Sequence, residues 1–206
     1  MSVESTSSVA DHVPVLMHEA VEALTLKDDG LYVDATYGRG GHSGCLLNRL
    51  AEAGQLLALD RDPEAIADAS VRFAAEPRFS IRQANFAALE DVLKQHGWLG
   101  EVDGVLMDLG VSSPQLDVAE RGFGFSRDGE LDMRMDPGSG ISAAQWLSNV
   151  SEDELVQVFR EYGEERYAKR IAAAIVQARV DKPITRTLQL AEIIKVAHPR
   201  LSLIHI

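Results

Sequence analysis

The stretch LYVDATYGRGGHSG, residues 31–44, decides the fold of this chain. It begins as a short apolar run that ends on a carboxylate, Asp34, and a helical pattern opens just beyond it at Cys45. Between them, four glycines fall within residues 38–44. Glycine lets the backbone turn through dihedrals closed to other residues and lets a ligand approach the main chain. A strand, a glycine loop and a helix start in this order are typical of a nucleotide-binding site.

Around this stretch, the sequence predicts an α/β fold with a parallel sheet. Three strand–helix units are followed by a fourth strand, and such alternation favours parallel strands joined by right-handed crossovers. Strands are expected at residues 31–35, 55–59, 79–83 and 102–107. Helices are expected from residue 18 onward for about two turns, and at residues 45–53, 64–75 and 86–96.

The first, second and fourth of these strands end on acids, Asp34, Asp60 and Asp108. Ligands of open parallel sheets bind outside the carboxyl ends of the strands, so we expect the three carboxylates to converge on one crevice. Asp60 follows Gly40 by twenty residues, the separation at which an acid commonly binds ribose hydroxyls. Asp34 would repel a pyrophosphate but tolerate a cationic ligand, which favours S-adenosylmethionine over NAD. The alternative is that acids at strand ends simply cap the next helices.

Beyond residue 108 the pattern changes. Residues 109–141 are rich in Gly, Ser, Pro, Asp and Arg and have no sustained period, which is typical of a functional loop. Helical periodicity then returns. Ser151 and Glu154 match a capping box ahead of one apolar stripe, and further stripes span residues 167–178 and 188–197. We therefore expect a small helical subdomain inserted after the fourth strand.

Length and composition limit the domain organisation and the classes of protein that this chain can belong to. With 206 residues and 46% apolar side chains, the chain fits one large domain or a domain with a subdomain. No apolar run approaches the ~20 residues of a membrane span, and the Ser-rich residues 1–11 are typical of a disordered lead-in, so a cytoplasmic location is expected. The single cysteine, Cys45, excludes an internal disulfide and a thiolate metal cluster. We predict a small buried side chain there and no metal site.

The net charge of −12 is unfavourable for contact with nucleic acid, because phosphates attract Lys and Arg. The distribution is more informative than the sum, since ten of the twenty Lys and Arg residues lie between Arg121 and Arg186. This segment is weakly favoured as a polyanion contact. Acids are interleaved throughout it, so a solvated helical surface is an equal alternative.

Several long, uninterrupted motifs resemble the ribosomal RNA small subunit methyltransferase H family, also called RsmH or MraW. They are HVPVL at 12–16, DATYGRGGHS at 34–43, LDRDP at 59–63, DLGVSSPQL at 108–116, ERGF at 120–123, LDMRMD at 131–136 and YGEER at 162–166. The resemblance covers residues 12–199 and implies a class I, Rossmann-like methyltransferase core with a helical insertion. It also implies S-adenosylmethionine-dependent N4-methylation of a cytidine in the decoding region of 16S rRNA. The implied partner is the small ribosomal subunit, and a homodimer stays open.

The resemblance also implies a set of cofactor contacts that joins the glycine loop to the strand ends. They are Gly40, Gly41, His42, Asp60, Phe86, Asp108 and Gln115, and the residue pattern itself adds Asp34 and Gly38. Without the family, Phe86 would be assigned to the core and Gln115 would carry no signal.

Methyl transfer to an exocyclic amine requires the nitrogen lone pair to be freed from the ring, and acceptors at both N–H groups favour that geometry. Asp108 and the backbone carbonyls of the turn at residues 110–114 are placed to supply such acceptors. The candidate catalytic residues are therefore Asp108, Ser112, Ser113 and Pro114. Many amino-methyltransferases carry two prolines and an aromatic at this point, whereas this chain carries Ser112, Ser113 and Pro114, so no aromatic platform is expected.

Three arginines of the basic segment, Arg121, Arg134 and Arg166, are candidate RNA contacts. Ion pairs with the neighbouring acids Glu120, Asp132 and Glu165 are an equal alternative.

The end of the chain departs from the family. No segment after residue 108 resembles the further strands that complete a class I sheet, and residues 200–206 no longer match. We expect a C-terminally truncated protein, with residues 12–114 as the first part of the core, 115–199 as the insertion, 200–206 as an unrelated tail, and the rest of the core missing. The fourth strand would then be an uncovered edge, and the fragment inactive. An NAD-dependent oxidoreductase and a non-catalytic nucleotide- or RNA-binding module are the alternatives.

Overall fold

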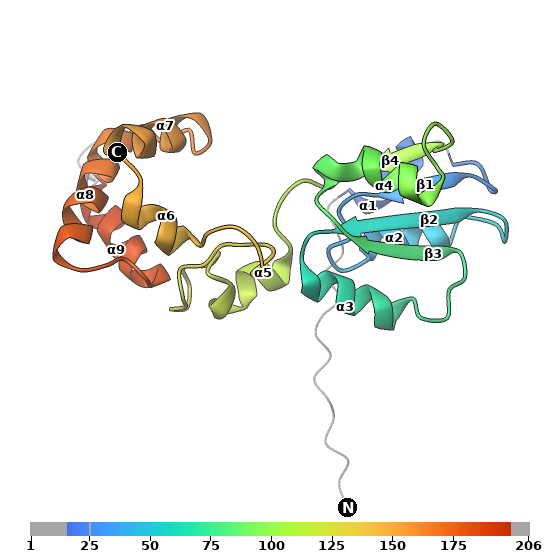
Figure 1. The fold of residues 1–206 in the computed structure, drawn as a ribbon, viewed down its shortest axis with the longest axis horizontal. Coiled ribbons are helices and arrows are strands. Elements are labelled where there is room, and N and C mark those ends of the chain that lie inside the picture. The colour runs from blue at the N-terminus through green and yellow to red at the C-terminus, as the bar shows by residue number, and fades with distance from the viewer. Residues whose placement is uncertain (1–15, 25, 199–206) are drawn as a thin grey trace, which may run out of the picture. The chain divides into compact units, whose positions relative to one another are not determined.

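A computed structural model describes residues 16–24 and 26–198 of the chain (Figure 1). The chain forms two compact units, Met1–Ser112 and Ser113–Ile206, and each is described by itself. The division falls two residues before the boundary expected after Pro114. The expected lead-in at residues 1–11 and tail at residues 200–206 lie outside the described part of the chain.

The first unit is built on a four-stranded sheet in which every pairing is parallel. Its strands are β1 (Leu31–Asp34), β2 (Gln55–Asp60), β3 (Phe79–Gln83) and β4 (Gly104–Leu106). The order β3-β2-β1-β4 means that the chain steps outward from β1 through β2 to β3, and then crosses back to place β4 on the other side of β1. The predicted α/β class with a parallel sheet is confirmed, and the switch point between β1 and β4 is where such sheets bind ligands.

The helices of the first unit begin within one residue of the expected positions when the 3-10 turn ahead of the last one is included, except the second, which begins four residues early at Gly41. They are α1 (Met17–Ala23), α2 (Gly41–Leu47), α3 (Pro63–Arg72) and α4 (Leu89–His96), with a single 3-10 turn, η1 (Phe86–Ala88), ahead of α4. The expectation that α2 reaches residue 53 is wrong. The chain leaves the helix after Leu47, because Ala51 N–H donates to the Asp28 carbonyl at 2.7 Å and turns the backbone toward β2. Gly54 permits this close approach, since a Cβ there would lie 2.6 Å from the same carbonyl oxygen.

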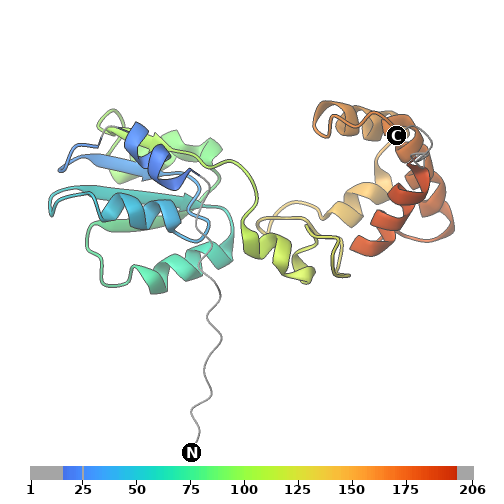
Figure 2. The same cartoon turned by 180° about the vertical axis from the view of Figure 1, so that it is seen from behind.

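Helices cover both faces of the sheet (Figures 1 and 2). On one face, Val21 of α1 and Leu46 of α2 pack with Leu56 of β2. On the other face, Leu93 of α4 packs with Leu57 of the same strand. Adjacent residues of a strand point to opposite faces, so a parallel strand buried on both sides needs a continuous apolar run, as β2 has.

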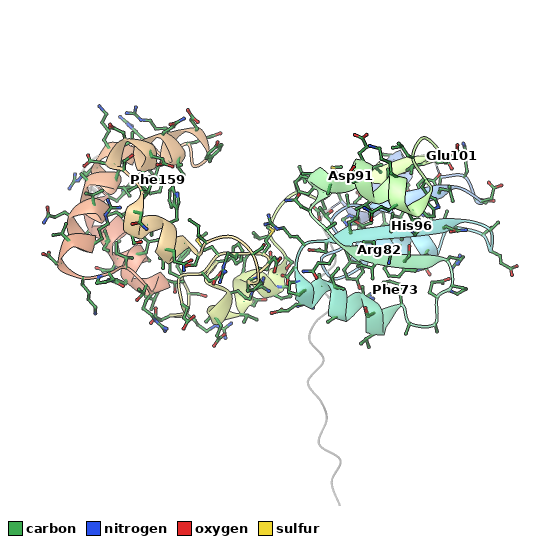
Figure 3. The ribbon with its side chains drawn as sticks, viewed as in Figure 1. Phe73, Arg82, Asp91, His96, Glu101 and Phe159 are labelled. Carbon is green, nitrogen blue, oxygen red and sulfur yellow. The ribbon has the colours of Figure 1, made fainter. Side chains whose placement is uncertain are left out.

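Helix α3 packs on the sheet beside the glycine loop. Its Ala65 and Ala69 are buried with Ala58 of β2 and Tyr37 of the loop. Phe73, labelled in Figure 3, caps the end of α3 and stacks against Phe79 with ring centroids 4.5 Å apart. Small side chains on α3 let the helix approach the sheet closely, and this position brings α3 within reach of the loop.

Strand β4 is shorter than expected, because only residues 104–106 pair with β1. No strand within the described part of the chain pairs with its other side. Val105, Met107 and Leu109 are exposed, as predicted for an uncovered apolar edge.

The second unit is helical. It contains α5 (Ser113–Asp117), the 3-10 turn η2 (Ala119–Arg121), α6 (Ala143–Asn149), α7 (Glu152–Glu161), α8 (Ala168–Asp181) and α9 (Thr187–Ala197). The last three match the expected stripes, and Leu155 of α7 is buried with Ile171 and Ile175 of α8. Helix α6 was not expected, although Ser142 and Gln145 form a complete capping box ahead of it. Its apolar pattern spans only two turns, too short to separate from a loop by periodicity.

Candidate functional site

The glycine loop lies at the carboxyl end of β1, between that strand and α2. Gly38 and Gly40 have φ values of +57° and +71°, a left-handed conformation that side-chain-bearing residues rarely adopt. The Gly40 N–H donates to the Tyr37 carbonyl at 2.8 Å, and the Tyr37 N–H donates to the Leu59 carbonyl of β2 at 2.9 Å. The loop is therefore a closed turn that is fixed to the neighbouring strand.

Asp34 lies beneath this loop and not in an open crevice. Its side chain is 0% exposed. One carboxylate oxygen accepts the Ser43 hydroxyl at 2.7 Å and the other accepts the Thr36 N–H at 3.2 Å. Burial raises the pKa of the Asp34 carboxyl, and the hydrogen bonds from Ser43 and Thr36 oppose that rise. The sequence predicted a direct ligand contact for Asp34, whereas in this conformation its side chain is not accessible to a ligand. Its hydrogen bond to Ser43 instead connects β1 to α2.

Asp60 holds the loop from its other side. Its Oδ2 accepts the Gly38 N–H at 2.8 Å, and its Oδ1 accepts the Asp62 N–H at 2.9 Å. Each carboxylate oxygen can accept a further hydrogen bond, so a partly exposed Asp60 retains acceptor capacity for a ligand. The cap of α3 is Asp62, whose side chain accepts the Glu64 N–H at 3.0 Å. Helix capping therefore does not explain Asp60.

Asp108 is the exposed acid of the three, with 60% of its side chain accessible. Its backbone N–H donates to the Thr36 hydroxyl at 2.7 Å, which ties the segment after β4 to the segment after β1. Its Oδ2 lies 3.9 Å from Nδ1 of His42, a buried residue of the first turn of α2. His42 at the start of α2 and Asp108 after β4 thus lie close together at one edge of the sheet.

Phe86 follows β3 at the same edge. The Ala84 N–H donates to the Asp60 carbonyl at 2.8 Å, and the Asn85 side chain then caps η1 by accepting the Ala87 N–H at 2.9 Å. Phe86 is 43% exposed, so it is not simply a core residue. It presents an apolar ring surface close to the end of β2.

The remaining candidates divide between the two units. Ser112 closes the first unit, while Ser113, Pro114 and Gln115 form the start of α5 in the second. Gln115 is buried. The stretch expected to carry the reaction is therefore split between two compact units after Ser112, whereas the boundary expected after Pro114 kept its candidate catalytic residues in the first unit.

Two of the three candidate RNA-binding arginines are engaged inside the second unit. Arg121 is buried and donates to the Met135 carbonyl at 2.9 Å. Arg134 pairs with Asp132 at 2.6 Å, and hydrogen bonding from this guanidinium lowers the pKa of Asp132. For Arg134 the ion-pair alternative therefore describes the structure. Arg166 is exposed, with its guanidinium carbon 5.7 Å from the ring centroid of Tyr167.

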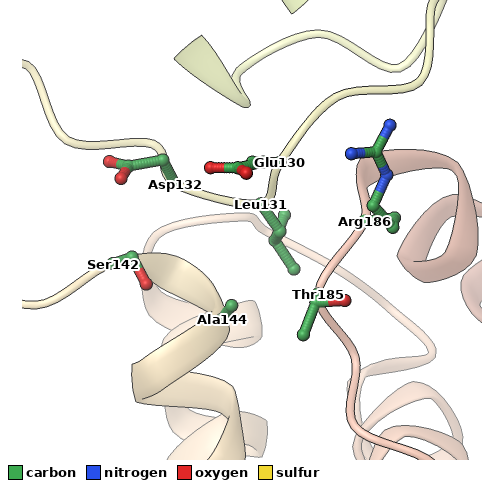
Figure 4. Close-up of a pocket in the computed structure, with 7 residues that line it drawn as sticks. All are labelled: Glu130, Leu131, Asp132, Ser142, Ala144, Thr185 and Arg186. Atoms are coloured by element: carbon green, nitrogen blue, oxygen red, sulfur yellow. The ribbon is translucent and has the colours of Figure 1, made fainter. Parts of the chain in front are cut away.

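A separate pocket of about 220 Å³ lies within the second unit (Figure 4). Glu130 and Asp132 lie on one side of it and Arg186 on the other. Two of its three charged residues already have protein partners, since Arg186 pairs with Asp128 at 2.9 Å and Asp132 with Arg134. The pocket has neither a glycine turn nor an aromatic surface among its lining residues, so it is not a candidate nucleotide site.

Sequence reasoning missed the residues that support the loop. Thr36 accepts the Asp108 N–H and fixes the end of β4, and Ser43 donates to Asp34 and fixes the start of α2. Asp62 accepts the Glu64 N–H and fixes the start of α3. Hydroxyl and carboxyl side chains that flank a glycine turn were the available signal.

Within residues 16–24 and 26–198, no helix combines the length and apolarity needed to cross a bilayer.

A doubly wound parallel sheet with a glycine turn after β1 and acids after its neighbouring strands defines an α/β protein of the nucleotide-ligand-binding class. Within that class, the sequence profile of the MraW methylase family matches residues 9–205. The chain belongs to this family, and the resemblance of its motifs is confirmed.

Two curated relatives are named ribosomal RNA small subunit methyltransferase H. The protein from Thioalkalivibrio sulfidiphilus is 57% identical over 188 residues, and the protein from Alteromonas mediterranea is 56% identical over 188 residues. Both alignments cover 91% of this chain, and the chain spans 60% of the length of these relatives.

Two solved structures are similar at low scores. A SAM-dependent methyltransferase from Aquifex aeolicus is 15% identical with a TM-score of 0.37, covering 71% of this chain and 78% of that one. The 23S rRNA methyltransferase ErmE is 13% identical with a TM-score of 0.33, covering 87% and 95% respectively. The fold assignment rests on strand order and pairing and not on these scores.

Proposed function

We propose that this protein is an S-adenosylmethionine-dependent methyltransferase that acts on N4 of a cytidine in the 16S rRNA of the small ribosomal subunit. The observation that carries the proposal is a preformed glycine loop, held between Asp34 and Asp60, in a chain of the MraW methylase family. The names of the relatives support rRNA as the substrate. The choice of N4 rests on the motif resemblance and on the chemistry of Asp108.

The residues at the edge of the sheet fit the donor. Asp60 has acceptor capacity for ribose hydroxyls, and Phe86 offers an apolar surface for the adenine. Asp60 and Asp108, the two acids that are not buried, give this edge a negative charge that suits a sulfonium and an amino group. When bound, S-adenosylmethionine supplies an electrophilic methyl group.

Asp108 is the residue best suited to receive the cytosine amino group. It is exposed, its backbone is fixed by Thr36, and an ionised carboxylate accepts hydrogen bonds only. Accepting a hydrogen bond from the amino group would draw its lone pair out of conjugation and stabilise the charge that develops on nitrogen. Backbone carbonyls of residues 110–112, in the same unit as Asp108, are proposed as the second acceptor.

RNA contact is proposed for the turn between α7 and α8. Arg160, Lys169 and Arg170 are exposed there, and no ion pair involves them in the part of the chain that the structure describes. Tyr162 is 81% exposed and could stack on an unpaired base. These side chains replace Arg121 and Arg134 as the favoured contacts, because those two are engaged within the unit.

Two measurements test the proposal. Calorimetric titration should show binding of S-adenosylmethionine and S-adenosylhomocysteine to this chain and none of NAD, and the opposite preference would favour an oxidoreductase. The full-length protein, incubated with labelled donor and small ribosomal subunits, should yield N4-methylcytidine after digestion of the 16S rRNA. Donor binding by that full-length protein without any transferred label would favour the alternative of a non-catalytic binding module.

A further inference from the structure

Tyr37 connects the glycine loop to helix α3. Its side chain is 3% exposed, and its hydroxyl donates to Oδ2 of Asp68 on α3 at 2.7 Å. The ring packs edge-on against Phe73, with centroids 6.2 Å apart. The loop lies directly on this ring, because a Cβ built at Gly40 would come within 2.7 Å of the Tyr37 hydroxyl.

Two arginines add contacts between the same loop and the same helix. The Arg39 guanidinium lies 3.7 Å from Asp68 and 3.6 Å from Glu64, two acids one turn apart on α3. From the end of α3, Arg72 donates to the carbonyl oxygen of Arg39 at 2.7 Å. The loop is thus bound to α3 by one buried hydroxyl, one guanidinium and one backbone carbonyl.

The Tyr37 hydroxyl is not needed to fill the core. A phenylalanine would keep the contacts with Phe73, since these involve the ring alone. What the hydroxyl adds is one bond to a fixed point on α3, next to the two left-handed glycines. Burial and the Asp68 carboxylate raise the pKa of this phenol, which favours the protonated form that donates the hydrogen bond.

We propose that Tyr37 and Asp68 are a positioning pair, which holds the glycine loop in its ligand-ready turn by fixing it to α3. Arg39 and Arg72 reinforce the pair, and Asp68 and Glu64 keep the Arg39 charge engaged with α3. That the loop receives a methyl donor rests on the proposed function. The set of contacts from Tyr37, Arg39 and Arg72 that joins the loop to α3, here called the clamp, is present in the unliganded chain.

The test compares three variants of this chain. Tyr37→Phe removes the bond but keeps the ring. Asp68→Asn keeps an acceptor for the hydroxyl but removes the anion beside Arg39. Ser70→Ala is the matched control, because the Ser70 hydroxyl is on the same helix and donates to the Ile66 carbonyl at 2.8 Å without touching the loop.

Amide hydrogen exchange of the free protein is the first readout. In Tyr37→Phe, exchange at Gly38 and Gly40 should rise by about fivefold or more, as expected when a local bond of ordinary strength is lost. Asp68→Asn should give a smaller rise, and Ser70→Ala none. Unchanged exchange at both glycines in Tyr37→Phe would overturn the proposal.

Donor affinity is the second readout. The dissociation constant for S-adenosylhomocysteine should rise by about five- to tenfold in Tyr37→Phe, because more of the free protein holds the loop in other conformations. A purely structural role for the hydroxyl would lower the melting temperature and leave this constant unchanged, which would also overturn the proposal. If the unmodified chain binds no donor while exchange rises in Tyr37→Phe, the clamp stands and the proposed function fails.

Discussion

Asp34 and Asp108 follow neighbouring strands of one sheet, yet their side chains have opposite environments. Asp34 is fully buried and accepts two hydrogen bonds from its own chain, whereas 60% of the Asp108 side chain is exposed. The acid under the glycine loop stabilises a conformation, and the acid after β4 remains available to a substrate. Position at a strand end therefore does not assign a role, and the contacts around each carboxylate do.

The strongest test of this difference is Asp108→Ala. In an assay in which the unmodified protein is active, methyl transfer should fall by about a hundredfold or more, as expected when an electrostatic acceptor in the transition state is removed. The melting temperature should change little, because the exposed Asp108 side chain is not part of the core. Radiolabel transfer to small subunits, together with thermal denaturation, checks both parts. Turnover at the wild-type rate would remove Asp108 from the reaction.

The next largest effect is expected within the loop. Gly40→Val places a Cβ 2.7 Å from the Tyr37 hydroxyl in a backbone conformation with φ +71°, so the turn cannot form as it is. Donor affinity should fall by about thirtyfold or more, since the glycine turn is the part proposed to contact the donor. Calorimetric titration measures it.

Gly97→Val is the matched control for this change. Gly97 has φ +79°, and a Cβ there would meet nothing within 4 Å. The control therefore carries the backbone strain without the collision and should lower stability while leaving donor affinity unchanged. Equal loss of donor affinity in both variants would show that global destabilisation, and not the loop, is responsible.

The substitution Asp34→Asn tests the buried environment of Asp34 through the pH dependence of the free energy of unfolding. Burial raises the pKa of Asp34 in the folded state, so in the window above its unfolded pKa the folded protein binds more protons than the unfolded one. The free energy of unfolding of the unmodified chain should therefore fall as pH rises through that window. The change is about 1.4 kcal/mol for each unit by which the folded pKa exceeds the unfolded one. Urea unfolding at a series of pH values measures it.

The Asn variant lacks the titrating group and should lose this component of the pH dependence. Its amide can still accept from Thr36 N–H and donate to the Ser43 oxygen, so the fold should be retained. A parallel pair of pH profiles for the two proteins would show that Asp34 is not protonated more easily in the folded state.

The sequence predicted the first unit well because its signals are local. The short continuous apolar run at residues 56–59 is typical of a doubly buried strand, and the left-handed turns at Gly38 and Gly40 favour glycine. Side-chain partners depend on three-dimensional approach, which spacing does not encode. The bond from Tyr37 to Asp68 spans 31 residues, and that from the Asp108 N–H to Thr36 spans 72.

The second unit was harder to predict for the same reason. Residues 109–141 contain few apolar residues at regular spacing, so α5 and η2 were not expected. Arg134 illustrates the limit for the site, because its charge predicted an RNA contact or an ion pair with equal force. The distance of 2.6 Å to Asp132 shows that the ion pair forms, and only the folded structure gives it.

The smallest predicted effect extends the contrast between engaged and exposed charges to this second unit. The double variant Lys169→Ala and Arg170→Ala removes two exposed cations. Its affinity for single-stranded 16S rRNA fragments should fall by about three- to tenfold at low salt, and the affinity should depend less steeply on salt concentration. Arg134→Ala is the control. It breaks the pair with Asp132 and should lower stability without changing the salt dependence of RNA binding. Fluorescence anisotropy over a range of salt concentrations measures both. If Arg134→Ala flattens the salt dependence and the double variant does not, RNA is bound by the LDMRMD motif and not by the turn between α7 and α8.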